Sequence, residues 1–318
     1  MYIHETRRLG PPGTAESGVP ANSRPFVGAA PAVRYGVPMS RVVDIDERAV
    51  RDALTAAAER TALLAASIDD TGMPAPHLQW SVGEVAAHLG GFCLPAFTDA
   101  VRGRQACWQP FIPQVDGFRE RLAGANARTL ERAPLPPADE LARMIRDGTR
   151  ALLDAVEGRG GDEMLHTPWY GEDATLDLTA VLCVMLGELL VHARDIARGL
   201  GRPWHIDAAE ARLVVGGVFT AMIPRIVDPV RARGVHATYE IRAWGGPRFV
   251  NRVDDGVAVA EPFTGQSVDC HLLGDPVELM LVGYGRRSQW TSIARGRLHA
   301  WGRRPWLGLR WKGLYLNP

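Results

Sequence analysis

One segment of this chain, an apolar helix with a polar stripe, limits the possible fold more than any other feature. Within residues 175–199 a nearly continuous apolar pattern is interrupted by Glu188, His192 and Asp195, spaced four and then three residues apart. An α-helix repeats about every 3.6 residues, so these side chains share one face. A helix this apolar is buried, and its polar stripe must be satisfied by other groups.

The polar stripe allows two interpretations. Glu188 and His192 could share a divalent metal ion, which removes the cost of burying the charge, and zinc accepts both imidazole nitrogen and carboxylate oxygen. Alternatively, Glu188 pairs with Arg194 or Arg198, and His192 is a hydrogen-bonded core histidine. A third ligand from another helix decides between them, because three protein ligands are usual in a catalytic zinc site.

A candidate third ligand, His88, lies about a hundred residues upstream. Ser81 and Glu84 have the spacing of a capping box, which predicts that a helix starts at Ser81. His88 then falls in the second turn, beside an apolar stripe, with small Ala86 and Ala87 next to it. The alternative is a half-exposed histidine on the flank of this helix.

Two motifs carry a resemblance to a known family. The Trp-Ser-Val of residues 80–82 leads to the Ala-His-Leu of residues 87–89, and Gly-Glu-Leu-Leu-Val-His-Ala-Arg-Asp-Ile-Ala follows at residues 187–197. Together with Leu-Gly-Arg-Pro-Trp at residues 200–204, they resemble the mycothiol-dependent maleylpyruvate isomerase family. The resemblance implies a DinB-like four-helix bundle whose metal ligands map onto His88, Glu188 and His192, with zinc as the expected metal.

The pattern along the chain predicts a helical domain after an irregular start. Residues 1–41 are rich in Gly, Pro, Ala and Ser and predict a flexible N-terminal extension. Residues 42–230 then show helical periodicity and correspond to the DinB-like metal-binding bundle. The helices are expected at residues 46–68, from residue 81, at 118–130, at 141–156, at 175–199 and at 207–224.

The hydrophobic period switches from helix to strand near residue 235. Antiparallel strands are expected at residues 236–243, 249–253, 256–260 and 267–273. Asp275 and Pro276 then predict a helix start. Residues 235–318 resemble the sterol-carrier-like α+β domain that this family appends, so the expected fold is a helical bundle followed by a small α/β domain.

The family resemblance implies the chemistry. A metal ion lowers the pKa of a bound thiol, and the family's thiol is the small molecule mycothiol. Its thiolate adds to an activated double bond, and rotation followed by elimination isomerises the alkene; related members transfer the sulfur instead. Two alternatives stay open: a carrier protein that binds an apolar ligand in its C-terminal domain, and a thiol-independent metal hydrolase. The sequence does not identify the electrophilic substrate.

Four further residues are candidates for the site. Arg286 is expected to anchor a substrate carboxylate, because arginine suits bidentate carboxylate recognition, with Arg287 as the alternative. Trp169 and Tyr170 are expected to line the cofactor pocket, although such aromatic residues more often belong to a core. Asp195 is expected to orient His192 through the second ring nitrogen.

Composition sets the remaining expectations. The 318 residues have a formal net charge of zero, which argues against a nucleic-acid partner, and 46% are hydrophobic, enough for two domains. The four cysteines show no paired spacing and are expected to be reduced thiols. Cys93 and Cys183 lie five residues from His88 and Glu188, so either could come near the metal, but small buried side chains are the preferred interpretation. Without a signal peptide or a membrane-spanning run, we expect a cytoplasmic monomer or homodimer that binds a small electrophile and a thiol.

Overall fold

The central element of the fold is helix α6, Leu178–Gly199, in which 18 of 22 residues are buried. The structure, a computed structural model, describes residues 42–316, so the predicted extension at residues 1–41 lies outside the described residues. Asp177 starts α6 by accepting a hydrogen bond from the backbone of Ala180, as an N-cap does. Burial over most of its circumference confirms the prediction from the apolar pattern.

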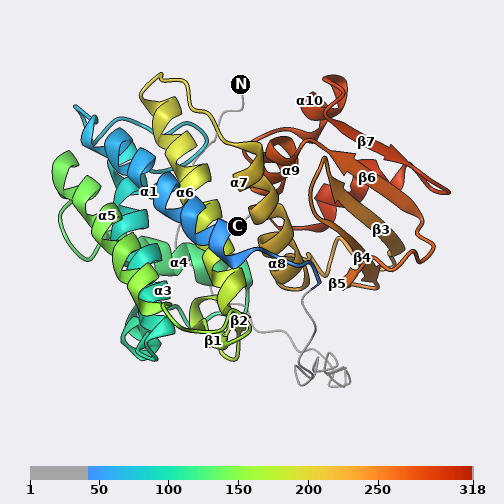
Figure 1. The fold of residues 1–318 in the computed structure, drawn as a ribbon, viewed down its shortest axis with the longest axis horizontal. Coiled ribbons are helices and arrows are strands. Elements are labelled where there is room, and N and C mark those ends of the chain that lie inside the picture. The colour runs from blue at the N-terminus through green and yellow to red at the C-terminus, as the bar shows by residue number, and fades with distance from the viewer. Residues whose placement is uncertain (1–41, 317–318) are drawn as a thin grey trace, which may run out of the picture. The chain divides into compact units, whose positions relative to one another are not determined.

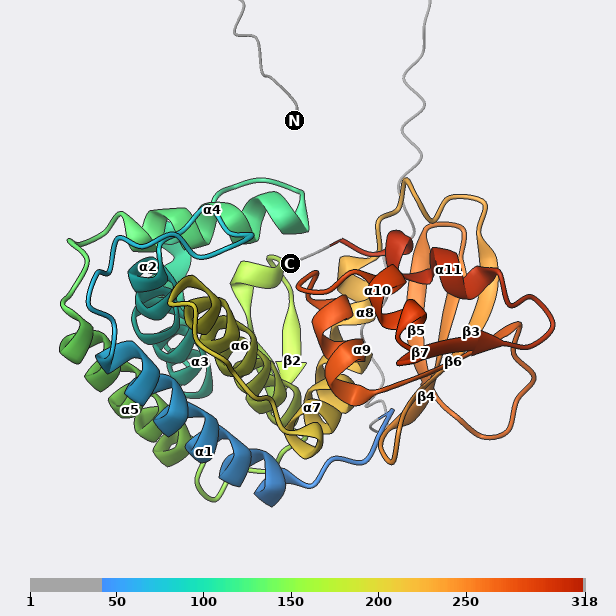
Figure 2. The same ribbon diagram turned by 90° about the horizontal axis from the view of Figure 1, so that it is seen from above.

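Other helices surround α6 and form the helical part of the molecule. Helices α1 and α2 pack directly against it, and α5 packs against α1 and α3 (Figures 1 and 2). Their apolar faces meet in one core, which is why the helical period of the sequence predicts their positions. The bounds are Glu47–Ala66 for α1, Val82–His88 for α2, Leu94–Val101 for α3, Phe118–Leu130 for α4 and Ala138–Ala155 for α5.

A five-stranded sheet forms most of the C-terminal part, in the order β5-β4-β3-β6-β7. The strands are β3 His236–Ala243, β4 Arg248–Asp254, β5 Val257–Pro262, β6 Cys270–Gly274 and β7 Leu298–Trp301. The expectation of antiparallel strands is wrong for β6, which runs parallel to β3. The chain leaves β5 at one edge and returns on the other side of β3, a non-local connection that no local pattern reveals.

Short elements complete both parts. A two-stranded hairpin precedes α6, formed by β1 Met164–His166 and β2 Thr175–Asp177. In the C-terminal part, Asp275 caps α9 as predicted. The helices there are α9 Pro276–Gly283, α10 Gln289–Ala294 and α11 Leu307–Trp311.

Helices α7, Ala208–Val214, and α8, Thr220–Ile226, connect α6 to the sheet. Helix α7 contacts both α6 and α9, and α8 packs against β5, so these helices lie between the bundle and the sheet (Figures 1 and 2). The described residues fall in one compact unit, and the predicted domain boundary near residue 230 stays a prediction. Across residues 42–316, no helix is both long enough and apolar enough to cross a membrane.

Candidate metal centre

The polar face of α6 is built as its spacing predicts. Glu188 Oε2 lies 3.2 Å from His192 Nε2, one helical turn away. On the other side of the imidazole ring, Asp195 Oδ2 lies 3.3 Å from His192 Nδ1, and the Asp195 side chain is only 1% exposed. Within residues 42–316 the carboxylate of Glu188 pairs with histidines, not with Arg194 or Arg198.

Helix α2 brings His88 to this face. The predicted capping box is present: Glu84 N–H donates to Ser81 Oγ over 3.1 Å, and Ser81 N–H donates to Glu84 Oε2 over 2.6 Å. His88 follows in the same helix, is buried, and places Nε2 3.6 Å from Glu188 Oε2. The three residues expected to bind a metal are therefore neighbours, although they come from helices far apart in sequence.

Three ring contacts hold this cluster together. The rings of His88 and His192 meet nearly edge to face, with centroids 5.1 Å apart. Trp80 lies over both histidines, with its ring centroid 5.0 Å from that of His88 and 6.4 Å from that of His192. The indole limits access of water to the imidazoles from that side, and it belongs to the Trp-Ser-Val motif that precedes α2.

A cysteine also reaches the cluster. Cys93 is buried, and its Sγ lies 3.0 Å from His88 Nε2 and 3.9 Å from Glu188 Oε2. One donor atom each from His88, Cys93 and Glu188 lie within 4.8 Å of one another, and His192 joins them through Glu188. Imidazole, thiolate and carboxylate are the ligand types that zinc binds in proteins.

The charges in the cluster favour ionised Glu188 and protonated His192. Burial alone raises the pKa of Glu188, but hydrogen bonds with His192 and His88 outweigh it and hold the pKa well below its usual range. Burial lowers the pKa of His192, while Asp195 and Glu188 together raise it to about 9. Burial lowers the pKa of His88, which is therefore neutral. The positive charge of protonated His192 thus compensates the negative charge of Glu188, as a bound cation would.

Arg286 extends the cluster into the C-terminal part. Its Nε donates to Asp195 Oδ2 over 2.9 Å and to Oδ1 over 3.2 Å, and its Nη1 donates to the carbonyl oxygen of Tyr284. The side chain is 12% exposed, so the guanidinium is not a solvated surface group. The alternative residue, Arg287, pairs elsewhere, with its Nε 3.4 Å from Glu278 Oε2. A continuous row of charges runs from Arg286 through Asp195 to His192 and Glu188.

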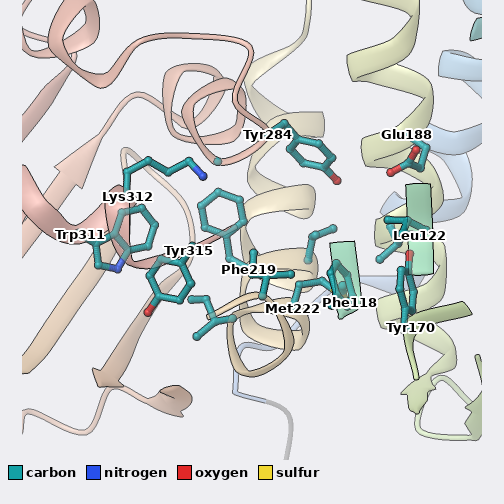
Figure 3. A pocket seen from close by; sticks show the side chains of 15 residues that line it. Phe118, Leu122, Tyr170, Glu188, Phe219, Met222, Tyr284, Trp311, Lys312 and Tyr315 are labelled. Atoms are coloured by element: carbon teal, nitrogen blue, oxygen red, sulfur yellow. The ribbon is translucent and has the colours of Figure 1, made fainter. Parts of the chain in front are cut away.

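An apolar pocket opens beside Glu188 (Figure 3). Its cavity volume is about 70 Å³, and it lies between the bundle and the C-terminal part. Figure 3 shows the Tyr284 hydroxyl and the Glu188 carboxylate pointing toward each other, with Lys312 on the opposite wall. The remaining walls are mainly apolar and aromatic, among them Phe118, Leu122, Tyr170, Phe219, Met222, Trp311 and Tyr315.

The two aromatic residues expected in the cofactor pocket have different positions. Tyr170 lines the pocket with Glu188. Trp169 is 1% exposed and packs edge to face on Phe97, with ring centroids 5.0 Å apart, so it contacts the core.

Three neighbours of the site were not singled out as site residues from the sequence: Trp80, Cys93 and Tyr284. Trp80 belongs to the Trp-Ser-Val motif, and its position directly before the helix cap Ser81 is the signal that could have identified it. Cys93 offers only its distance of five residues from His88, and that spacing does not fit one face of an α-helix. Tyr284 offers only its position two residues before Arg286.

Comparisons with known proteins agree with part of this picture. Two solved structures illustrate the range of similarity. A mycothiol-dependent maleylpyruvate isomerase is 12% identical, and the match covers 82% of this chain and 95% of that one with a TM-score of 0.46. A sec-alkylsulfatase, Pisa1 from Pseudomonas sp., is 14% identical, and the match covers 72% of this chain and 32% of that one with a TM-score of 0.29. At these values neither structure supports an inference about this chain. No curated protein matches it significantly.

A family model gives the stronger result. Residues 54–197 match the mycothiol maleylpyruvate isomerase N-terminal domain, and the match includes His88, Glu188 and His192. Arg286, Tyr284 and the sheet lie beyond it. Over this segment, which is less than half of its length, the chain is therefore similar to the mycothiol maleylpyruvate isomerase N-terminal domain.

Proposed function

We propose that this protein is a metal-dependent enzyme that uses a low-molecular-weight thiol, mycothiol, to isomerise an electrophilic small molecule or to transfer sulfur to it. One observation carries the proposal: His88, Glu188 and His192 meet in a buried cluster whose carboxylate also lines an apolar pocket. The family match supports mycothiol as the thiol.

The residues present fit a divalent metal, and zinc is our choice. His88 Nε2 and His192 Nε2 both lie near the same Glu188 oxygen, so three donor groups of the types that zinc prefers converge in a buried site. Bound there, the ion would act as a Lewis acid that lowers the pKa of a thiol toward neutrality. Because the carboxylate is ionised and buried, binding a cation compensates its charge.

Asp195 and Arg286 are positioning residues in this proposal. Asp195 faces the Nδ1 side of His192, which leaves Nε2 directed at Glu188. Arg286 in turn neutralises Asp195, which is almost completely buried. Partners of this kind fix the ring orientation of a metal ligand, and their loss typically costs about 10–100-fold in metal affinity or activity.

The pocket indicates the kind of substrate. Its apolar walls favour an electrophile with an apolar or aromatic body, and Lys312 offers a cationic contact for an anionic group. Burial and the negative charge of Glu188 raise the pKa of Tyr284 and of Tyr170 well above their ordinary values. Both phenols therefore stay protonated at neutral pH and can donate hydrogen bonds to a substrate oxygen that gains negative charge.

We also propose that Arg286 anchors a substrate carboxylate, with Arg287 as the alternative. Support comes from its partly buried position between Asp195 and Tyr284. The Nε of Arg286 donates to Asp195 and its Nη1 donates to the carbonyl oxygen of Tyr284. A substrate carboxylate would therefore bind a guanidinium that already has two protein partners. Kinetics and zinc content of Arg286→Lys separate anchoring from positioning.

The domain arrangement belongs to the same proposal. We assign residues 42–230 to a DinB-like metal-binding domain and residues 235–318 to a sterol-carrier-like domain. The helical and sheet-containing parts of the chain support this division. A small-molecule thiol is kept reduced in the cytoplasm, where we expect the enzyme to work.

Metal content and thiol binding test the proposal together. We expect purified full-length protein to bind one zinc ion, and mycothiol to raise the melting temperature of the zinc form, because a ligand that binds only the native state stabilises it. His88→Ala and His192→Ala should lose the zinc and the mycothiol effect. His166→Ala is the matched control, because His166 lies on β1, outside the cluster. Stoichiometric zinc in both cluster variants would refute the assigned centre.

A second pocket favours one alternative, a carrier protein for an apolar ligand. This pocket of about 380 Å³ lies in the C-terminal part and is lined mainly by apolar side chains of β6, β7 and helices α9 to α11, such as Leu279, Ile293 and Trp306. Extraction and mass spectrometry of the purified protein would detect a lipid there. A bound lipid together with the absence of zinc favours the carrier; turnover without any thiol favours a metal hydrolase.

A further inference from the structure

The structure assigns a fourth metal ligand, Cys93, to the proposed centre, in addition to His88, Glu188 and His192. We infer that the sulfur binds the ion directly and closes the site in its resting form. The inference rests on the proposed metal function, and nothing in the family match assigns a role to this cysteine.

Distances support direct coordination. Zinc binds sulfur at about 2.3 Å and nitrogen or oxygen at about 2.0–2.2 Å, so neighbouring ligand atoms of a tetrahedral site lie roughly 3.3–3.6 Å apart. The pairs Cys93–His88, His192–Glu188, His88–Glu188 and Cys93–Glu188 are separated by 3.0, 3.2, 3.6 and 3.9 Å. The donor atoms of His88, Cys93 and Glu188 lie within 4.8 Å of one another, so small side-chain shifts would bring these three to the tetrahedral values. His192, which is close to Glu188, would have to turn further toward the other two.

The backbone between His88 and Cys93 is shaped to bring the two side chains together. In a regular α-helix, residues five apart point about 140° away from each other. Here the segment Leu89–Cys93 is a π-helical turn, in which Leu94 N–H bonds to the carbonyl oxygen of Leu89. A π-turn takes one more residue per turn, so positions five apart return to nearly the same face. Such turns are rare and occur often at functional sites.

The surroundings of Cys93 also favour a ligand over a packing residue. The sulfur is buried, yet it contacts an imidazole nitrogen and a carboxylate rather than apolar atoms alone. Cys183, which is also buried, packs instead against Gly217 of the π-turn that follows α7. Only Cys93 among the cysteines of residues 42–316 shares a cluster of metal-ligand type with a histidine and a glutamate.

A closed site has a consequence for the proposed chemistry. Catalytic zinc sites usually keep one position open for a water or a substrate, whereas four protein ligands leave none. With four protein ligands around the ion, an incoming thiol would have to replace the Cys93 sulfur: its proton would pass to Cys93 and its own sulfur would take the vacated position. The exchange neither oxidises nor reduces either sulfur.

Cobalt substitution tests this assignment without turnover. Full-length protein is reduced with a phosphine, stripped of metal and loaded with Co²⁺ in the absence of any thiol. We expect one bound cobalt ion and a near-ultraviolet sulfur-to-cobalt charge-transfer band. Cys93→Ser should still bind cobalt through the other ligands but lose the band. Cys107→Ser, at an exposed cysteine outside the cluster, should keep it.

Each other outcome has a defined meaning. Cobalt bound without the band in the wild type, or a band that persists in Cys93→Ser, overturns the role of Cys93 and leaves the proposed centre intact. A wild type that binds no cobalt overturns both. Zinc X-ray absorption gives a second readout, with one sulfur expected at about 2.3 Å in the wild type and none in Cys93→Ser. Circular dichroism of both variants checks that they are folded.

Discussion

At the scale of single residues, the site depends on how buried charges compensate one another. Asp195 is 1% exposed and faces both His192 and Arg286, so removing either partner leaves its buried charge only partly compensated. Each of these residues therefore influences its neighbours in the row. Substitutions that keep the charge but change the geometry are the informative ones.

Arg286→Lys keeps a cation but loses the planar fork. If Arg286 anchors a substrate carboxylate, we expect catalytic efficiency to fall by about 1–3 kcal/mol of transition-state binding, with zinc stoichiometry unchanged. Steady-state kinetics and metal analysis on the same samples measure both effects. Arg287→Lys is the control. Loss of zinc along with activity would show instead that Arg286 acts by holding Asp195 beside His192.

Lys312 predicts a pH-dependent stability. Burial first, and then the charge of Arg231, lower its pKa from 10.5 to about 8, so the native state disfavours the charged form. The unfolded state binds more protons between pH 8 and 10.5, and stability from this group therefore rises with pH across that window. Lys312→Met should be about 1–3 kcal/mol more stable than the wild type at pH 7.

Urea unfolding at several pH values checks this prediction. The advantage of Lys312→Met should shrink as the pH rises through the window, because the wild-type lysine then loses its charge in the native state while the unfolded state stays protonated. Lys312 also lines the pocket, so the same variant should bind an anionic substrate more weakly at pH 7. A stability difference that is independent of pH would contradict the assigned pKa.

At the scale of elements, local signals predicted the helices, and non-local contacts decided what the sequence alone did not reveal. The capping residues Ser81 and Asp275 marked helix starts because their effect is confined to the next turn. The π-turns and the parallel pairing of β6 with β3 depend on packing between distant segments. For the same reason His88, Glu188 and His192 could be proposed by resemblance, but Cys93 and Tyr284 could not.

The π-turn after α2 should be sensitive at one glycine and tolerant at the next. A Cβ on Gly90 would lie 2.8 Å from the Cβ of Met144, whereas a Cβ on Gly91 would meet only the end of that side chain at 3.5 Å. We expect Gly90→Ala to lower the free energy of unfolding by about 1–3 kcal/mol, because helix α5 must move away. Gly91→Ala should be neutral or slightly stabilising.

Thermal and urea unfolding measure this pair. If the turn positions Cys93, the cobalt charge-transfer band of Gly90→Ala should also weaken while that of Gly91→Ala is retained. Equal stability of the two variants would mean that the contact with Met144 relaxes without cost.

At the scale of the whole molecule, contacts between the bundle and the C-terminal part are distributed along α6. The hydroxyl of Tyr284 packs so closely on Gly187 that a Cβ there would lie 2.1 Å from it, and Arg286 holds Asp195 two turns further on. Helix α8 packs against β5. Within the C-terminal part, Asn251 on β4 accepts hydrogen bonds from Trp311 and Tyr315, which fixes the last segment on the sheet.

These contacts predict that zinc stabilises both parts of the chain. In our proposal zinc binds His88, Glu188 and His192 on the helices. His192 contacts Asp195, and Asp195 contacts Arg286 of the C-terminal part. Ordering of the metal centre should therefore extend to α9 and the sheet. Hydrogen–deuterium exchange of the metal-free and zinc-loaded protein measures this extension. We expect slower exchange in α6 and also in β3 and β6, and Arg286→Met should confine the effect to the helices. Slower exchange in the helices alone for the wild type would show that the two parts unfold independently.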